Sequence, residues 1–192
     1  MKEPKTRVEN AIKIAHEQHN GHSRRINRLP EVTHPFKVYR IAKIYTTNED
    51  ILIAALLHDV PDDTLGYGVP EIHRDFGEKV SAIVAELTHY QSDTAPGPAN
   101  WHRRKKDMLQ RLDNFTPGPA LIYACDKIHD MESLARDCHK YGTVVWGKFN
   151  APPDQKRWYY TRVLIALRNR CPNPELLDRL EKAWQELSLL IP

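Results

Sequence analysis

The sequence predicts an all-α fold, and three observations lead to this class. Apolar residues recur at helical spacing along most of the chain. The segments that carry this pattern begin at capping residues or prolines and end at Gly, Asn or Thr. Strand signals are almost absent, since the one short β-like run, at 143–146, lies between two glycines. We therefore expect a bundle of about eight or nine helices.

The first half of the chain holds five expected helices. In the first, Val8, Ile12 and His19 share one face, and Asn20-Gly21 ends it. A polar, arginine-rich loop separates it from the second, which begins at Thr33-His34-Pro35 because proline suits the first helical position. The expected ranges are 5–20, 33–45, 49–59, 70–76 and 80–88.

The second half begins with a loop and ends with a helical pair. Residues 91–100 have the composition of a loop, and 137–153 are expected to be irregular because of their glycines and prolines. Asn173 followed by Pro174 is typical of a helix start. The expected helices are 101–112, 118–136, 154–170 and 174–189.

Length and composition indicate one domain over residues 1–192, large enough to bury a core. No apolar run is long enough to span a bilayer, and the N-terminus lacks the apolar segment of a signal peptide. Three cysteines without a CxxC spacing fit reduced thiols better than a disulfide framework. We therefore expect a cytoplasmic protein with no membrane partner, and its oligomeric state is left open.

The stretch from Ile51 to Thr64 is the centre of the chain. Seven apolar residues run directly into His58-Asp59, and Asp62 and Asp63 follow. Buried carboxylates require a compensating charge, which a metal ion at the end of a buried helix would supply. The alternative is an ordinary helix end, at which His58 caps carbonyl groups and the aspartates are solvated in a turn.

Two further positions resemble this one, because ionisable residues stand where apolar residues are expected. His34 begins the second helix, and Asp126 follows an apolar segment. Each has a simpler explanation, such as an ion pair between Asp126 and Lys127. Together, His34, His58, Asp59 and Asp126 form a nitrogen and oxygen donor set that suits Mn²⁺, Fe²⁺ or Zn²⁺ and leaves room for water and substrate.

Acidic and basic residues near these positions predict phosphate chemistry. Asp62 and Asp63 are placed to accept a proton from an attacking water. Arg24 and Arg25, shortly before His34, are placed to bind a substrate phosphate. The basic run at 102–106 is interpreted as a solvated helix face, with nucleic-acid binding as the weaker alternative.

On these residues the chain resembles the HD-domain phosphohydrolases, and within them the (p)ppGpp hydrolases of the RelA/SpoT type and the small alarmone hydrolases. The likeness runs over about residues 8–136. It is carried by three motifs: His19-Asn20-Gly21-His22-Ser23-Arg24-Arg25 with His34-Pro35, Leu56-Leu57-His58-Asp59-Val60-Pro61-Asp62-Asp63-Thr64, and Cys125-Asp126-Lys127-Ile128-His129-Asp130-Met131.

The resemblance implies a function and a role for each site residue. The implied activity is removal of the 3′-pyrophosphate of guanosine (p)ppGpp by an activated water, with a small-molecule nucleotide as the binding partner. The metal, Mn²⁺ with Fe²⁺ or Zn²⁺ as alternatives, is held by His34, His58, Asp59 and Asp126. Asp62 and Asp63 act on the water, and the substrate is bound by Arg24, Arg25, Asp130, Ser133 and Tyr159.

Three departures from the family pattern bear on the substrate. Asp62 replaces the usual Glu, Ser133 replaces Thr, and Asp130 replaces an Asn that can donate a hydrogen bond. An ionised Asp only accepts hydrogen bonds and repels phosphate. Two alternatives therefore stay open, which are a phosphohydrolase for another nucleotide and a non-catalytic nucleotide-binding or antitoxin-like protein.

Overall fold

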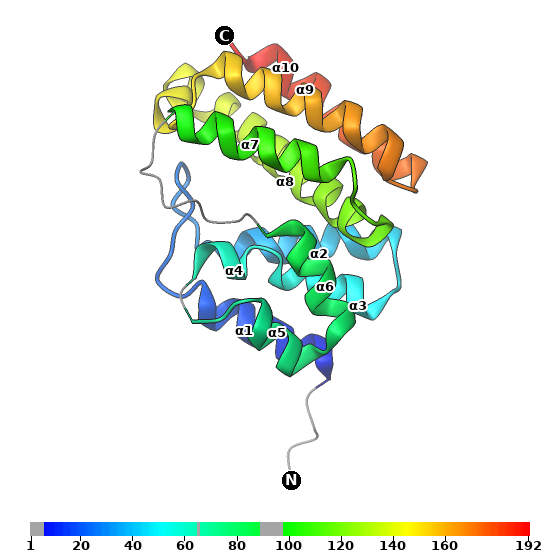
Figure 1. The fold of residues 1–192 in the computed structure, drawn as a ribbon. Helices are drawn as coiled ribbons and strands as arrows, with labels where there is room; N and C mark the ends of the chain where they lie inside the picture. The colour runs from blue at the N-terminus through cyan, green and yellow to red at the C-terminus, as the bar shows by residue number, and fades with distance from the viewer. Residues whose placement is uncertain (1–5, 65, 89–97) are drawn as a thin grey trace. The chain divides into compact units, whose positions relative to one another are not determined.

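The computed structural model describes residues 6–64, 66–88 and 98–192, and within them all regular structure is helical. The all-α prediction is confirmed, and the helices follow one another along the chain in Figure 1. Their bounds are α1 Arg7–Gln18, α2 Thr33–Tyr45, α3 Glu49–Leu57, α4 Val60–Asp63, α5 Val69–Phe76, α6 Glu78–Leu87, α7 Pro98–Leu112, α8 Pro117–Tyr141, the 3₁₀ helix η1 Gly142–Lys148, α9 Pro153–Arg170 and α10 Pro174–Leu190. Residues 91–97 of the expected loop lie outside the described residues.

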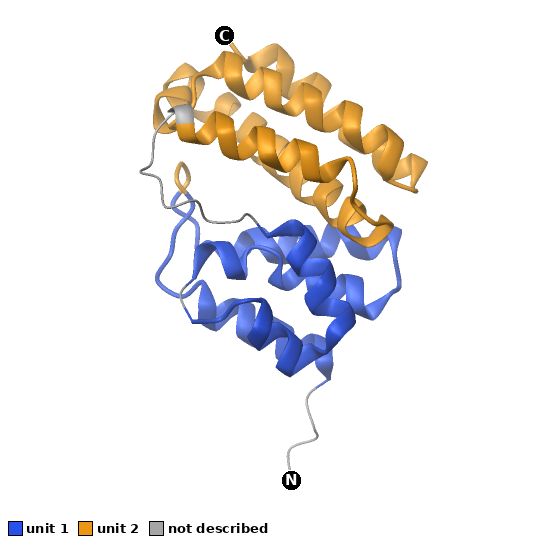
Figure 2. Ribbon diagram, viewed as in Figure 1, with its two compact units in different colours: residues 1–24, 28–88 blue, residues 25–27, 89–192 orange. Residues whose placement is uncertain are grey.

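The chain divides into two compact units, which Figure 2 colours separately. Unit 1 is residues 1–24 and 28–88, and unit 2 is residues 25–27 and 89–192. The expectation of a single domain over 1–192 stays a prediction. No helix in the described ranges is long and apolar enough to cross a membrane.

In unit 1, α3 packs against α1, α2 and α6. It is apolar on every side, and a helix with that composition is stable only when it is enclosed. Asn48 caps its start, since its side chain accepts hydrogen bonds from the Asp50 and Ile51 amides. Its buried residues are Leu52, Ile53, Ala54, Ala55, Leu56 and Leu57.

The α3 helix ends earlier than the expected residue 59, and Pro61 explains the difference. Continuing the helix would require residue 61 to donate its amide to the Leu57 carbonyl, and proline has no amide hydrogen. A short helix, α4, restarts at Val60. His58 and Asp59 therefore stand at the junction of two helices.

In unit 2, α8 packs against α9, α10 and η1, while α7 packs against α9. The α8 helix runs to Tyr141, five residues beyond the expected end, and stops at Gly142, whose positive φ of 70° favours glycine. The β-like run at 143–146 forms part of η1 rather than a strand.

Candidate metal centre

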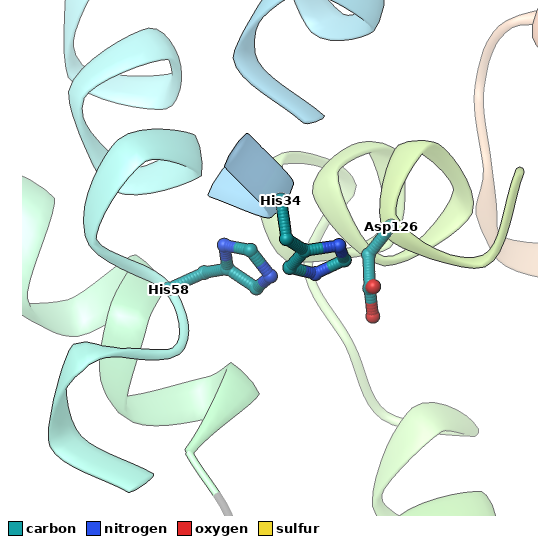
Figure 3. A group of neighbouring side chains, drawn as sticks. All are labelled: His34, His58 and Asp126. Atoms are coloured by element: carbon teal, nitrogen blue, oxygen red, sulfur yellow. The ribbon is translucent and has the colours of Figure 1, made fainter. Parts of the chain in front are cut away.

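His34 and His58 lie side by side in unit 1. His34 is in the first turn of α2 and His58 follows the last residue of α3. Their ring centroids are 5.4 Å apart, and both residues are buried. Figure 3 shows the two rings, and it also labels Asp126, which belongs to α8 of unit 2 and is described with that unit below.

Asp59 completes a group of three donors within unit 1. Its Oδ2 atom is 3.1 Å from His34 Nε2 and 3.2 Å from His58 Nε2. These separations are those of hydrogen-bonded atoms, and they are also close enough for all three atoms to bind one ion. Unit 1 therefore supplies two imidazole nitrogens and one carboxylate oxygen to a single point.

The tautomer of His58 fits an ion at that point. His58 Nδ1 is 2.9 Å from the Ala55 carbonyl oxygen, and because a carbonyl only accepts, Nδ1 carries the proton. In the neutral ring, Nε2 then presents a lone pair to the Asp59 carboxylate. Two acceptors at this distance require a proton or a cation between them, and a metal-binding histidine commonly holds its other nitrogen in this way.

In the absence of a metal, a proton on Nε2 of each histidine takes the place of the ion, and the two histidines then stabilise the ionised form of Asp59. Burial acts to raise the pKa of Asp59, but the charge of His58 and hydrogen bonds from both histidines outweigh it and hold the pKa well below its usual range. Asp59 is therefore an anionic donor. The set of two His and one Asp can hold a divalent ion, and its chemistry does not select one metal.

Asp63 lies one helical turn after Asp59, and its backbone amide donates to the Asp59 carbonyl at 3.0 Å. The Asp63 side chain is 43% exposed at the surface, but partial desolvation by the surrounding protein, together with the negative charge of Asp59, raises its pKa to about 7. A carboxylate with that pKa can take up a proton near neutral pH. Asp62, in the same short helix, is partly buried.

Helical spacing predicts that His19 lies on the apolar face of the first helix, without a role in the site. In the structure its side chain is fully buried at the end of α1, and its Nδ1 is 3.9 Å from Asp63 Oδ2. Burial lowers the pKa of His19, so the ring is neutral beside that carboxylate. Among the described residues, neither ring nitrogen of His19 has a hydrogen-bond partner, and the sequence could not indicate such a buried imidazole.

The two arginines of the 21–33 loop are held in different ways. Arg24 Nη1 lies 2.8 Å from Glu31 Oε1, and its amide donates to the Leu29 carbonyl, so it closes the loop of unit 1. Arg25 belongs to unit 2, where Nη1 donates to the Lys148 carbonyl at 3.2 Å. Their predicted role in phosphate binding stays a prediction.

In unit 2, Asp126 and Asp130 flank Lys127 on α8. Lys127 Nζ is 2.7 Å from Asp126 Oδ2 and 3.0 Å from Asp130 Oδ2. Burial alone would lower the pKa of Lys127, but the two carboxylates outweigh it and raise the pKa well above its usual value. The ion pair that the sequence offered as an alternative for Asp126 is thus present within this unit, and the role of Asp126 as a ligand stays a prediction.

Ser133 and Tyr159 are both buried in unit 2. Ser133 lies one turn after Asp130 on α8, and the Tyr159 hydroxyl hydrogen-bonds to that of Tyr123. The ring of Tyr159 also meets the edge of Trp101. Tyr159 therefore has the packing of a core residue, and its contact with substrate stays a prediction.

The interpretation of residues 102–106 as a solvated face is wrong for Lys105. This residue is half-buried, and its Nζ lies 5.1 Å from the centre of the Tyr159 ring. Arg103, Arg104 and Lys106 are exposed as expected. The burial of Lys105 could have been predicted from helical spacing. Position 105 lies three residues before the buried Met108 and seven before the buried Leu112, so all three share the inner face of α7.

A protein-family comparison now bears on this geometry. The family model described as "HD domain" matches residues 11–146, which is most of the chain. The chain belongs to the HD domain family. The likeness predicted from the sequence motifs is confirmed at this level.

Curated relatives of two kinds are similar to this chain. The guanosine-3′,5′-bis(diphosphate) 3′-pyrophosphohydrolase MESH1 of Xenopus tropicalis is 30% identical over 129 residues, covering 66% of this chain and 68% of the relative. The GTP pyrophosphokinase of Streptomyces coelicolor is 28% identical over 127 residues, again 66% of this chain. The chain spans only 14% of that enzyme's length.

A solved structure with a similar fold covers nearly the whole chain. The metazoan orthologue of SpoT that hydrolyses ppGpp matches with a TM-score of 0.76 at 23% identity, over 99% of this chain and 100% of that chain. A structure from Listeria monocytogenes matches with a TM-score of 0.68 at 22% identity, over 82% of this chain and 98% of that one. These likenesses confirm the helical fold.

Proposed function

We propose that the chain is a metal-dependent phosphohydrolase that removes the 3′-pyrophosphate of guanosine (p)ppGpp or a similar alarmone. The observation that carries the proposal is the meeting of His34, His58 and Asp59 at one point, with His58 in the tautomer that leaves Nε2 for a metal. Membership of the HD family and the activity named for MESH1 support the choice of reaction.

The metal is Mn²⁺ in this proposal, and Asp126 is its fourth ligand. The support for Asp126 is its place in the Cys125–Met131 motif, and the support for Mn²⁺ is the mixed nitrogen and oxygen donor set. A bound divalent ion supplies Lewis acidity to the phosphate and lowers the pKa of the attacking water. The three buried, free cysteines agree with a reducing, cytoplasmic setting.

The side chains of this protein transfer the proton, position the attacking water and bind the substrate phosphates. Asp63, with its pKa near neutrality, accepts the proton of the attacking water, and Asp62 orients that water. Water oxygen bonds to the phosphorus attached to the ribose O3′, and the O3′–P bond breaks. The ribose hydroxyl leaves with a proton, and pyrophosphate is released. Arg24 and Arg25 bind phosphate oxygens.

Asp130 favours a second candidate, a phosphohydrolase for a different nucleotide. An Asn at this position could donate a hydrogen bond, whereas Asp130 only accepts, and its negative charge is offset by Lys127 at 3.0 Å. A nucleotide with a donor group facing Asp130 would be preferred over one with an acceptor there.

Product analysis on metal-stripped protein reloaded with Mn²⁺, Fe²⁺ or Zn²⁺ tests both candidates. Pyrophosphate released from ppGpp, and lost in His58→Ala, supports the alarmone function. The matched control is His139→Ala, because His139 is an exposed histidine paired with Glu186. Turnover of another nucleotide but not of ppGpp supports the second candidate. Absence of turnover with every nucleotide, in protein that binds metal, contradicts both.

A further inference from the structure

The buried imidazole of His19 has a hydrogen-bonding capacity that the metal centre does not use. Its side chain is fully buried, and neither ring nitrogen has a hydrogen-bond partner among the described residues. A polar group in this state costs the fold free energy, because it has left water without gaining a partner. A group that persists despite such a cost is typical of a functional site.

The position of the His19 ring is fixed by α1. Ala11, Ala15 and His19 follow one another at intervals of four residues, so the ring continues the buried inner face of this helix. The His19 amide donates to the Ala15 carbonyl at 3.2 Å, and the His22 amide donates to the His19 carbonyl at 3.1 Å. The helix itself packs against α3, which leads into the metal centre. The ring is therefore held on a rigid element beside that centre.

Asp63 is the carboxylate that faces this ring. Its Oδ2 atom is 3.9 Å from His19 Nδ1, which is about 1 Å longer than a hydrogen bond. Asp63 is the last residue of the short helix α4, and its side chain is partly exposed. A rotation of this side chain toward the ring closes the hydrogen bond, and catalytic hydrogen bonds are often long before substrate binds.

We propose that His19 is a positioning residue for Asp63, and that its Nδ1–H group donates a hydrogen bond to Asp63 Oδ2 during hydrolysis. The direction of the bond follows from the two groups, because an ionised carboxylate only accepts and Nδ1 must therefore carry the proton. With Oδ2 engaged, Oδ1 is left to take the proton of the attacking water. The role of Asp63 in this inference rests on the proposed function, whereas its contact with His19 does not.

A neutral His19 ring suits this role. Burial lowers the pKa of His19, and the neutral ring has one nitrogen that donates and one that accepts. It therefore orients the carboxylate without adding a positive charge that would repel a metal ion. Holding a proton acceptor in one orientation raises the rate of the chemical step rather than the affinity for substrate.

Amide substitutions distinguish the two nitrogens of the ring in assays of ppGpp hydrolysis by Mn²⁺-loaded protein. The amide nitrogen of asparagine lies near the place of Nδ1, and that of glutamine near the place of Nε2. His19→Asn should therefore keep kcat within about threefold of the unmodified protein. His19→Leu has no donor, so its kcat should fall about tenfold or more at an unchanged KM, and His19→Gln should resemble it.

The Tm separates positioning from a structural role. His19→Leu removes a buried polar group that lacks a partner, so its Tm should equal or exceed that of the unmodified protein. The matched control is His16→Leu, because His16 is an exposed histidine on the same helix, and this variant should change neither Tm nor kcat. A lower Tm together with a lower kcat in all three His19 variants would show a structural role and overturn the proposal.

The contact is also measured without metal or substrate, by long-range ¹H–¹⁵N NMR of the His19 ring in the full chain in EDTA. We expect a neutral ring protonated at Nδ1, whose nitrogen signals shift in Asp63→Ala. A ring protonated at Nε2 that does not respond to Asp63→Ala overturns the positioning role, and so does a normal kcat in His19→Leu. The expected spectrum in a protein that does not hydrolyse ppGpp would refute the proposed function alone.

Discussion

Lys156 on α9 is 8% exposed, and Lys156→Met makes the cost of its buried ammonium measurable as a function of pH. The pKa of this group falls from 10.5 to about 8 in the folded protein. At about 1.4 kcal/mol per pH unit, the ammonium destabilises the fold by about 3 kcal/mol when it is protonated in both the folded and unfolded chains. The methionine variant should be more stable by this amount at pH 7.

The difference should shrink at alkaline pH. Above pH 8 the folded protein releases the Lys156 proton while the unfolded chain keeps it up to about 10.5. The unfolded state then binds more protons, so the stability of the unmodified protein rises with pH relative to the variant. The groups that set this titration are Asp130 and Lys127 on α8, Lys105 on α7 and Arg25.

Urea denaturation of both proteins in EDTA at pH 7 and at pH 9.5 provides the measurement. The variant's advantage in free energy of unfolding should fall by about half between the two pH values. Lys182→Met, in which an exposed lysine is replaced, should show no such pH dependence. A variant that is less stable at pH 7, or whose advantage is independent of pH, would refute the account of Lys156.

Three further predictions concern the site. In Asp63→Asn, metal binding should persist while kcat at pH 7 falls about 100-fold, because the proton acceptor is lost; an unchanged kcat in metal-loaded protein would contradict its role. In Asp130→Asn, Lys127 keeps its ion pair with Asp126 while one negative charge near the substrate phosphates is removed, so the KM for ppGpp should fall several-fold. A KM equal to or higher than that of the unmodified protein argues for another nucleotide. Removal of the metal should lower the Tm of the unmodified protein but leave the Tm of His34→Ala unchanged. Elemental analysis of His34→Ala should find a metal content near zero. Equal losses of Tm in the two proteins would show that the ion binds elsewhere.

Much of the centre of unit 1 could be predicted from the sequence because the signal there is local. An apolar run followed at once by His58-Asp59 can be buried only if the two polar side chains face a partner. Proline at 61 also indicated a break, although not that a new helix would begin at Val60. The approach of His34, by contrast, depends on how α2 packs on α3, which helical periodicity does not specify.

The burial of Lys105 and Lys156 in unit 2 does not follow from composition. Lys105 stands in a run of charged residues, and composition favours an exposed face for such a run. Lys156 likewise lies among polar residues at the start of α9. Their burial comes from the packing of α7 on α9, together with the rings of Trp101 and Phe149, and these contacts join residues far apart in the sequence.

The most direct test of the central claim is the product formed from ppGpp by Mn²⁺-loaded protein in ¹⁸O-labelled water, followed by ³¹P NMR and mass spectrometry. The proposed mechanism predicts GDP and pyrophosphate, with the label in the pyrophosphate because water attacks phosphorus, and no product from His58→Ala. Release of orthophosphate instead of pyrophosphate, label in the GDP, or equal activity in the His58 variant would contradict the account.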